Sequence, residues 1–140
     1  MRIRVLAYAK PTEDPEKVRE AVLNVFNGEV VVVEEGKGYY RVEGFSNSRS
    51  SLNKMYNLVR AGQIAPAVRS YLLKNKRGNA ITILLHKQAA YMGKISLIDS
   101  DRESPLGAIR IEIEHDNPYE IINWLAPEHR QKRRGTRSRP

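Results

Sequence analysis

The sequence has no cysteine among its 140 residues. This absence excludes disulfide bonds, thiolate nucleophiles and cysteine-ligated zinc or iron–sulfur sites, and it suits a reducing compartment. Long apolar runs are also missing, because no stretch reaches the roughly eighteen apolar residues of a membrane-spanning helix and the first residues show no cleavage signal. We therefore expect a cytoplasmic protein that does not use a membrane as a partner.

Residues arranged for catalysis or metal binding are scarce too. The three histidines stand at positions 86, 115 and 129, without the spacing of metal ligands. The glycines at 36 and 38 lack the lysine and helix that follow a phosphate-binding loop, and no serine lies in a nucleophile elbow. We expect no metal, no cofactor and no enzymatic activity.

Positive charge is concentrated at one end of the chain. The formal net charge is +8, but residues 128–140 contain six basic residues and one acidic residue, so this tail carries +5 and residues 1–127 only +3. The tail has no large apolar side chain, so we expect it to be disordered when unbound and to follow a single domain over residues 1–127. Its charges, among them Lys132, Arg133 and Arg134, predict sequence-independent contact with RNA, with protein contact or solubility as the alternative.

Apolar residues at every second position predict most of the strands. This period of two places alternate side chains on opposite faces of a sheet, as expected of half-buried strands. The predicted strands cover residues 2–9, 30–33, 39–43, 79–86, 94–99 and 109–114. We expect residues 79–86 and 94–99, joined by residues 87–93, to form an antiparallel hairpin at the centre of the sheet.

Residues typical of helix starts and apolar residues at helical spacing lie between these strands. Asp14, followed by a proline, has the residue type of an N-cap before a first helix. Apolar residues at helical spacing occupy 52–59 and 64–72, and Pro66 fits only the first turn of a helix, so we expect two consecutive helices that meet at an angle. Pro118 opens the last helix.

The predicted order is strand, helix, two strands, two helices, three strands, helix. Neighbouring hairpins imply a largely antiparallel sheet, and the one-sided alternation implies that the helices cover one face of it. The sequence therefore predicts a two-layer α+β fold.

The sheet face away from the helices is the first candidate site. Its outward positions carry Arg2, Arg4, Tyr8, Tyr39, Arg41, Thr82, His86, Lys94 and Arg110. Tyrosine rings can stack on bases while arginine and lysine neutralise phosphates, so this pattern indicates RNA binding, although three glutamates at 43, 112 and 114 share the face. The alternatives are a polar, solvated face or a dimer contact through Leu6, Tyr8 and Tyr39.

The connection between the two strands of the predicted hairpin is the second candidate site. It concentrates hydrogen-bond donors and an aromatic ring in a loop, where function often lies. Together with Arg77, the residues expected to hold an RNA backbone there are His86, Lys87, Gln88, Tyr91 and Lys94. The alternative is that Tyr91 and Met92 pack across the edge of the core while the lysines are solvated.

Four sequence motifs also carry a resemblance. They are PTEDPEKV at 11–18, KQAAYMGK at 87–94, ESPLG at 103–107 and WLAP at 124–127. In this order they resemble an uncharacterised archaeal family of small proteins that is grouped with RNA-binding, exosome-associated proteins and is similar in fold to the large-subunit ribosomal protein that binds five-S RNA. The resemblance implies an α+β domain, a cytoplasmic setting and RNA as the partner, and it brings no catalytic residue.

The leading hypothesis is a non-enzymatic RNA-binding or ribonucleoprotein accessory protein. In this hypothesis the open sheet face and the connection hold RNA, and the tail adds affinity. The alternative is a protein-interaction module without a nucleic-acid role, for example a homodimer formed through the sheet face or through an edge strand.

Overall fold

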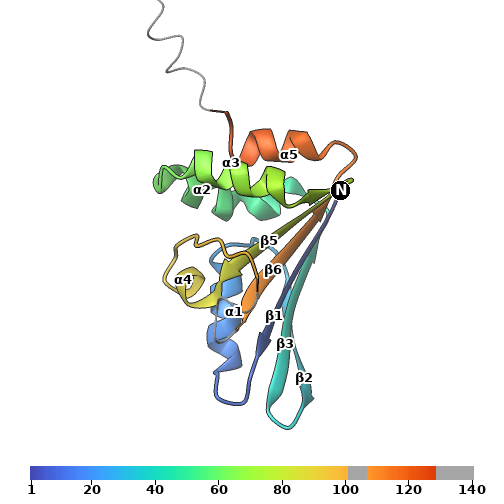
Figure 1. The fold of residues 1–140 in the computed structure, drawn as a ribbon. Helices are drawn as coiled ribbons and strands as arrows, with labels where there is room; N and C mark the ends of the chain where they lie inside the picture. The colour runs from blue at the N-terminus through green and yellow to red at the C-terminus, as the bar shows by residue number, and fades with distance from the viewer. Residues whose placement is uncertain (101–106, 129–140) are drawn as a thin grey trace, which may run out of the picture.

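The computed structural model describes residues 1–100 and 107–128 of the chain. These residues form a six-stranded antiparallel sheet in the order β2-β3-β1-β6-β5-β4, with helices packed on one side of it (Figure 1). The strands are β1 (Arg2–Ala9), β2 (Val30–Gly36), β3 (Tyr39–Ser46), β4 (Lys76–Arg77), β5 (Ala80–His86) and β6 (Ala108–Glu114). The expected two-layer α+β fold is confirmed.

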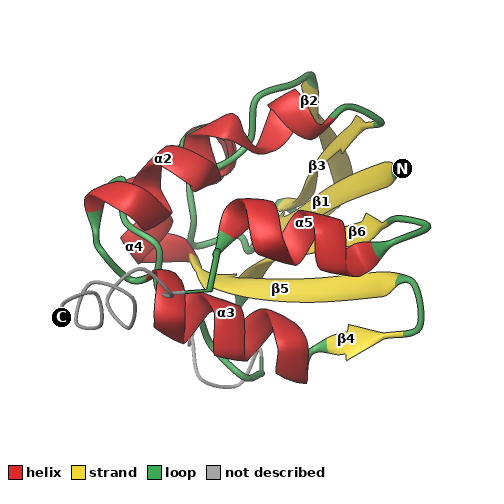
Figure 2. Ribbon diagram, turned by 90° about the horizontal axis from the view of Figure 1, so that it is seen from above, coloured by secondary structure: helices red, strands yellow, loops and turns green. Residues whose placement is uncertain are grey.

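The helices of the described residues make the second layer. They are α1 (Pro15–Leu23), α2 (Asn53–Ala61), α3 (Ala65–Lys74), α4 (Lys87–Tyr91) and α5 (Pro118–Leu125), with a 3₁₀ turn, η1 (Arg49–Leu52), before α2. Helix α1 packs on β1, β2 and β3 (Figure 1), whereas α2, α3 and α5 pack on one another and α3 lies on β5 (Figure 2). In the part of the chain that the structure describes, no helix has the length and apolar character needed to cross a membrane.

Burial along the strands shows which face the helices cover. In β1 the side chains of Ile3 and Val5 are buried, whereas those of Arg2 and Arg4 are exposed. Strands β5 and β6 add their isoleucines to the same core, although Leu84 of β5 and Ala108 of β6, in a separate small cluster, are also buried. The opposite face of the sheet therefore carries the outward side chains that the sequence places there.

The helix boundaries follow the predicted signals. The side chain of Asp14 accepts a hydrogen bond from the backbone nitrogen of Glu16 at 2.9 Å, and α1 begins at the intervening proline. Pro66 lies in the first turn of α3, where its missing N–H group leaves no hydrogen bond unmade. The two expected consecutive helices and the helix that begins at Pro118 are confirmed.

The predicted central hairpin is only partly present. Strands β1 and β6 occupy the middle of the sheet, and β5 lies beside the short edge strand β4, so the central position of the hairpin is wrong. Residues 94–99 form no regular strand and contribute one bridge, between Leu97 and Leu85. Lys94 is therefore exposed beside the sheet rather than in a strand, and α4 fills the connection.

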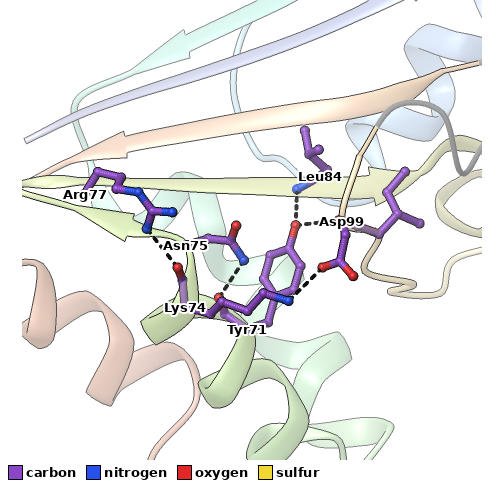
Figure 3. Close-up of polar contacts among 7 residues, drawn as sticks. Tyr71, Lys74, Asn75, Arg77, Leu84 and Asp99 are labelled. Carbon is purple, nitrogen blue, oxygen red and sulfur yellow. Dashed lines mark hydrogen bonds and ion pairs between the residues drawn. The ribbon is translucent and has the colours of Figure 1, made fainter.

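Tyr71 of α3 explains why residues 94–99 do not pair fully with β5. Its hydroxyl accepts a hydrogen bond from the backbone nitrogen of Leu84 at 3.0 Å (Figure 3) and donates one to the carbonyl oxygen of Ile98 at 2.7 Å. The phenol thus takes the place of one direct hydrogen bond, from the nitrogen of Leu84 to the carbonyl oxygen of Ile98, whereas the nitrogen of Ile98 still donates to the carbonyl oxygen of Leu84 at 3.0 Å. Ile98 instead turns onto the outer face, where it packs on Leu84 and Ala108.

Gly44 of β3 gives room for a buried ring. A Cβ atom at Gly44 would lie 2.7 Å from the Cε2 atom of Phe26, whose side chain is fully buried. Because the ring cannot move into solvent, we expect Gly44→Ala to lower the free energy of unfolding by about 1–3 kcal/mol, measured by urea denaturation. The cost should fall in a Phe26→Leu background, and an unchanged cost there would contradict the explanation.

Candidate nucleic-acid interface

The outer face of the sheet brings together six of the predicted site residues. They are Arg2, Arg4 and Tyr8 of β1, Tyr39 and Arg41 of β3, and Arg110 of β6. In the pairing of β1 with β3, Tyr8 lies opposite Arg41, and in the pairing of β1 with β6, Leu6 lies opposite Arg110. These side chains therefore share one surface, as the alternation in the sequence predicts.

A hollow of about 520 Å³ lies on this face, and we call it the sheet hollow. Its lining residues are Arg4, Leu6, Tyr8, Lys10, Gly107, Ala108, Arg110 and Glu112. Tyr8 is 52% exposed and lines the hollow, so part of its side chain can be reached by a ligand. Over residues 1–100 and 107–128, Arg4 has no hydrogen bond or ion pair with another residue. The sheet hollow thus offers an open ring and an available guanidinium group.

Ion pairs reduce the positive charge of the rest of this face. Arg2 pairs with Glu114 across β1 and β6, and Arg110 pairs with Glu112 two positions along β6 at 2.9 Å. Arg41 also pairs with two carboxylates, those of Glu35 and Glu43. A phosphate that approaches these three arginines has to compete with glutamates, so the excess of charge is smaller than a count of arginines suggests.

Exposed apolar groups occupy the same face toward its β2 edge. Val31 of β2, and Tyr39 and Phe45 of β3, each leave about half of the side chain in contact with solvent. Phe45 lies opposite Arg4 in the pairing of β1 with β3. Aromatic rings beside cationic groups suit stacked bases, and they also suit a protein partner.

Lys87 of the predicted connection lies inside the protein. Its side chain is 4% exposed, and its Nζ atom lies 3.0 Å from the Oε2 atom of Glu13 and donates to the carbonyl oxygen of Tyr8 at 2.7 Å. The ammonium group therefore fixes the end of β1 to the segment before α1. It does not face the surface on which the other predicted residues lie.

The remaining residues of the connection are spread over separate places. His86 caps α4, because its Nδ1 atom accepts a hydrogen bond from the backbone nitrogen of Ala89 at 3.3 Å. Gln88 and Tyr91 line a second hollow of about 410 Å³ between α1 and α4. The alternative, in which Met92 packs across the core edge, is wrong for this residue, since its side chain is exposed. The predicted contact residues of the tail, Lys132, Arg133 and Arg134, lie outside the described residues.

The sequence contains a charge signal that the strand pattern does not reveal. Residues 44–98 include no aspartate or glutamate but nine basic residues. In the structure this stretch forms α2, α3, β4, β5 and α4. Its arginines at 49, 60 and 69 lie in η1, α2 and α3, on the helical layer rather than on the outer sheet face. An interval free of acidic residues could have pointed to this layer.

Two of these arginines converge on the C-terminal end of α5. Arg60 donates to the carbonyl oxygens of Trp124 at 3.0 Å and Leu125 at 3.3 Å. Arg69 donates to the carbonyl oxygen of Ala126 at 3.1 Å and to the side chain of Asn123 at 2.8 Å. The last carbonyl groups of a helix lack partners within it, so these guanidinium groups cap α5.

A third arginine reaches the same helix end through an aromatic stack. The ring of Tyr56 stacks on Trp124 with 4.7 Å between the centroids. The guanidinium carbon of Arg60 lies 3.5 Å from the Tyr56 centroid, and that of Arg49 lies 4.9 Å from the Trp124 centroid. We call Arg49, Arg60 and Arg69 the arginine cluster.

The described residues offer no metal site. Over 1–100 and 107–128, no three histidine, aspartate or glutamate side chains are grouped so that they could hold an ion. The cationic and aromatic groups that line the sheet hollow have the chemistry of anion contact and stacking.

Comparison with known proteins gives consistent matches over most of the chain. A family model described as RNA binding matches residues 2–115. A UPF0201 protein of Aeropyrum pernix is 47% identical over 128 residues, which cover 91% of this chain and 85% of the relative. A UPF0201 protein of Metallosphaera sedula is 42% identical over 139 residues, which cover 99% of this chain and 92% of the relative. The crystal structure of a UPF0201 protein from Methanococcus jannaschii matches with a TM-score of 0.82 and 30% identity, over 93% of this chain and 96% of that one.

Proposed function

The chain belongs to the archaeal UPF0201 family, whose matching family model is described as RNA binding, and from this premise we propose that it is a non-enzymatic RNA-binding protein. It acts in the cytoplasm as an accessory component of a ribonucleoprotein. The observation that carries the proposal is the sheet hollow, where the open ring of Tyr8 and the available guanidinium group of Arg4 line one cavity. Its RNA ligand is single-stranded, because only unstacked bases can reach a ring on a sheet.

The two groups have separate roles in this proposal. A base stacks on the ring of Tyr8, and Leu6 and Ala108 give the floor beside it an apolar surface. Arg4 lies four residues along the same face of β1, and its guanidinium group binds a phosphate of the same strand through charge-assisted hydrogen bonds. The volume of about 520 Å³ lies within the range of ligand pockets, roughly 300–1,000 Å³.

Fluorescence anisotropy with a labelled single-stranded RNA of mixed sequence tests this role. Loss of a base stack costs about 1–3 kcal/mol, so we expect Tyr8→Ala to weaken binding roughly five- to 150-fold. Arg4→Gln should weaken binding and also lower its salt dependence. Tyr119→Ala is the matched control, because Tyr119 is 50% exposed but lies on α5 in the other layer.

Three results would reject the role of the sheet hollow. They are no RNA binding by the intact protein at low salt, equal losses for Tyr8→Ala and Tyr119→Ala, and binding that disappears entirely when the basic tail is deleted. The last result would leave RNA contact to the tail alone.

A second candidate function is self-association through the same face. The exposed side chains of Val31, Tyr39 and Phe45 favour it. Val31 lies on β2, the edge strand of the sheet with a strand neighbour on one side only, and Tyr39 and Phe45 lie on that neighbour, β3. Light scattering over a range of protein concentrations tests it. A monomer at every concentration would remove this candidate.

A further inference from the structure

We propose that another hollow on the outer face of the sheet binds a guanine base of the RNA. This inference rests on the proposed function, since it assumes that single-stranded RNA is the ligand, and it adds a base preference to that function. The hollow has a volume of about 360 Å³, and we call it the edge hollow because it includes part of the edge strand β2. Its lining residues include Arg4, Glu29, Val31, Glu43 and Phe45.

Arg4 connects the edge hollow to the sheet hollow. It lines both of them, and in the pairing of β1 with β3 it lies opposite Phe45, with the Cα atoms of such a pair about 5 Å apart. Tyr8 lies four residues along the same face of β1, which is roughly 14 Å in a strand. An RNA strand whose phosphate binds Arg4 can therefore place one base in each hollow.

Phe45 provides the stacking surface of the edge hollow. Its side chain is 57% exposed on the outer face, and that of Val31 on the neighbouring strand is 51% exposed. A base that covers these groups removes apolar surface from water, but stacking on a ring accepts every base. A preference for one base therefore has to come from a polar group beside the ring.

Glu29 provides this polar group. It is exposed and precedes β2, and over residues 1–100 and 107–128 its side chain has neither an ion pair nor a hydrogen bond. Glu43, the other carboxylate of the edge hollow, accepts a hydrogen bond from the Nε atom of Arg41 at 3.1 Å. An ionised carboxylate only accepts hydrogen bonds and repels phosphate. Glu29 therefore selects a base edge that carries N–H donors.

Guanine satisfies this carboxylate better than the other bases do. Its Watson–Crick edge presents two adjacent donors, N1–H and N2–H, to which a carboxylate can offer both of its oxygens. Adenine and cytosine carry an acceptor nitrogen beside the amino group, and uracil carries one N–H between two carbonyl groups. These bases lose one of the two hydrogen bonds and bring an acceptor toward a negative charge. The edge hollow therefore favours guanine.

Fluorescence anisotropy of the full chain with three labelled RNAs measures this preference. The RNAs have equal length and alternate uridine with guanosine, adenosine or inosine. A good bidentate contact discriminates between bases by roughly five- to 150-fold, so we expect the guanosine RNA to bind more tightly than the adenosine RNA by such a factor. Inosine lacks only the N2 amino group, so its RNA should bind with intermediate affinity. Equal affinities for the guanosine and inosine RNAs would overturn the inference.

Glu29→Gln tests the assignment of the contact to one residue. The amide keeps one acceptor and loses the other, so the ratio of the affinities for the guanosine and adenosine RNAs should fall toward one. The ratio is the readout because removing a negative charge strengthens the binding of every RNA. The matched control is Glu34→Gln, since Glu34 is also exposed and lies on β2 but does not line the edge hollow. An unchanged ratio in Glu29→Gln, or equal falls in both variants, would overturn the inference.

The outcomes also separate this inference from the proposed function. RNA binding that depends on Tyr8 but shows no preference for guanine would overturn the edge hollow as a base site and keep the sheet hollow. A preference that depends on Glu29 in a protein whose binding does not depend on Tyr8 would do the reverse. No RNA binding by the wild type at low salt would overturn both. A dimer that Phe45→Ala dissociates, without any guanine preference, would assign the edge hollow to self-association and overturn the inference.

Discussion

Replacing Lys87 with methionine is expected to lower the free energy of unfolding by about 3–5 kcal/mol, because it leaves a carboxylate buried without its partner. Lys87 and Glu13 are 4% and 9% exposed, and the Nζ and Oε2 atoms lie 3.0 Å apart. The same ammonium group donates to the carbonyl oxygen of Tyr8 at 2.7 Å. Methionine replaces the unbranched chain of lysine up to Cε but removes the charge and all three donors.

Urea denaturation measures the effect, and a second ion pair supplies the control. Lys74 and Asp99 lie 3.3 Å apart with both side chains exposed, so Lys74→Met should change the free energy of unfolding by less than about 1 kcal/mol. In a double-mutant cycle, Glu13→Gln should reduce the cost of Lys87→Met, since no uncompensated carboxylate then remains. A similar small cost for Lys87→Met and Lys74→Met would show that the buried pair is not important for stability.

This ion pair also connects stability to the proposed RNA site. Tyr8 contributes its carbonyl oxygen to Lys87 and its ring to the sheet hollow. The pair therefore fixes the end of β1 from the inner side while the ring projects on the outer side. Lys87, which the sequence suggests as an RNA contact, instead positions a residue of the proposed RNA site.

The sequence predicts elements well where the deciding interactions are local. Asp14 and its proline determine the start of α1 within a few residues, and Pro66 can only lie in a first helical turn. The alternation of Ile3 and Val5 with Arg2 and Arg4 likewise depends on strand geometry alone. These features need no knowledge of distant residues, and the structure contains all of them.

Prediction from the sequence fails where a contact with a residue far away along the chain determines the local structure. The alternation in residues 94–99 is typical of a strand, but Tyr71 of α3 inserts its hydroxyl between this segment and β5. The sequence suggests that Lys87 is a surface donor in a loop. In the structure it forms a buried ion pair with Glu13, which lies 74 positions earlier in the chain. Periodicity contains no information about such contacts.

The ion pairs of the candidate site can likewise be predicted only where both partners are close in the sequence. Arg110 and Glu112 are two positions apart on one face of β6, so their pairing can be anticipated from strand geometry, whereas that of Arg2 with Glu114 depends on the strand order. The arginine cluster requires still more, because Arg60 and Arg69 meet only at the end of α5. The acid-free interval of residues 44–98 indicates that a basic surface exists but not where its charges converge.

Removing the hydroxyl of Tyr71 with Tyr71→Phe is expected to lower the free energy of unfolding by about 2–4 kcal/mol. The hydroxyl accepts from the nitrogen of Leu84 at 3.0 Å and donates to the carbonyl oxygen of Ile98 at 2.7 Å. Both contacts are partly buried, and a buried polar group left without a partner costs roughly 1–3 kcal/mol. Phenylalanine keeps the ring and its packing, so the loss reports on the two hydrogen bonds.

Hydrogen exchange locates the effect that denaturation measures. The amide of Leu84 should exchange faster in Tyr71→Phe, whereas the amide of Ile98, which donates directly to the carbonyl oxygen of Leu84 at 3.0 Å, should lose less protection. Tyr119→Phe is the control, because the hydroxyl of Tyr119 has no hydrogen bond within the described residues and should change stability by less than about 0.5 kcal/mol. Unchanged exchange at Leu84 would mean that the phenol does not bridge the two segments, and the irregular path of residues 94–99 would then need another cause.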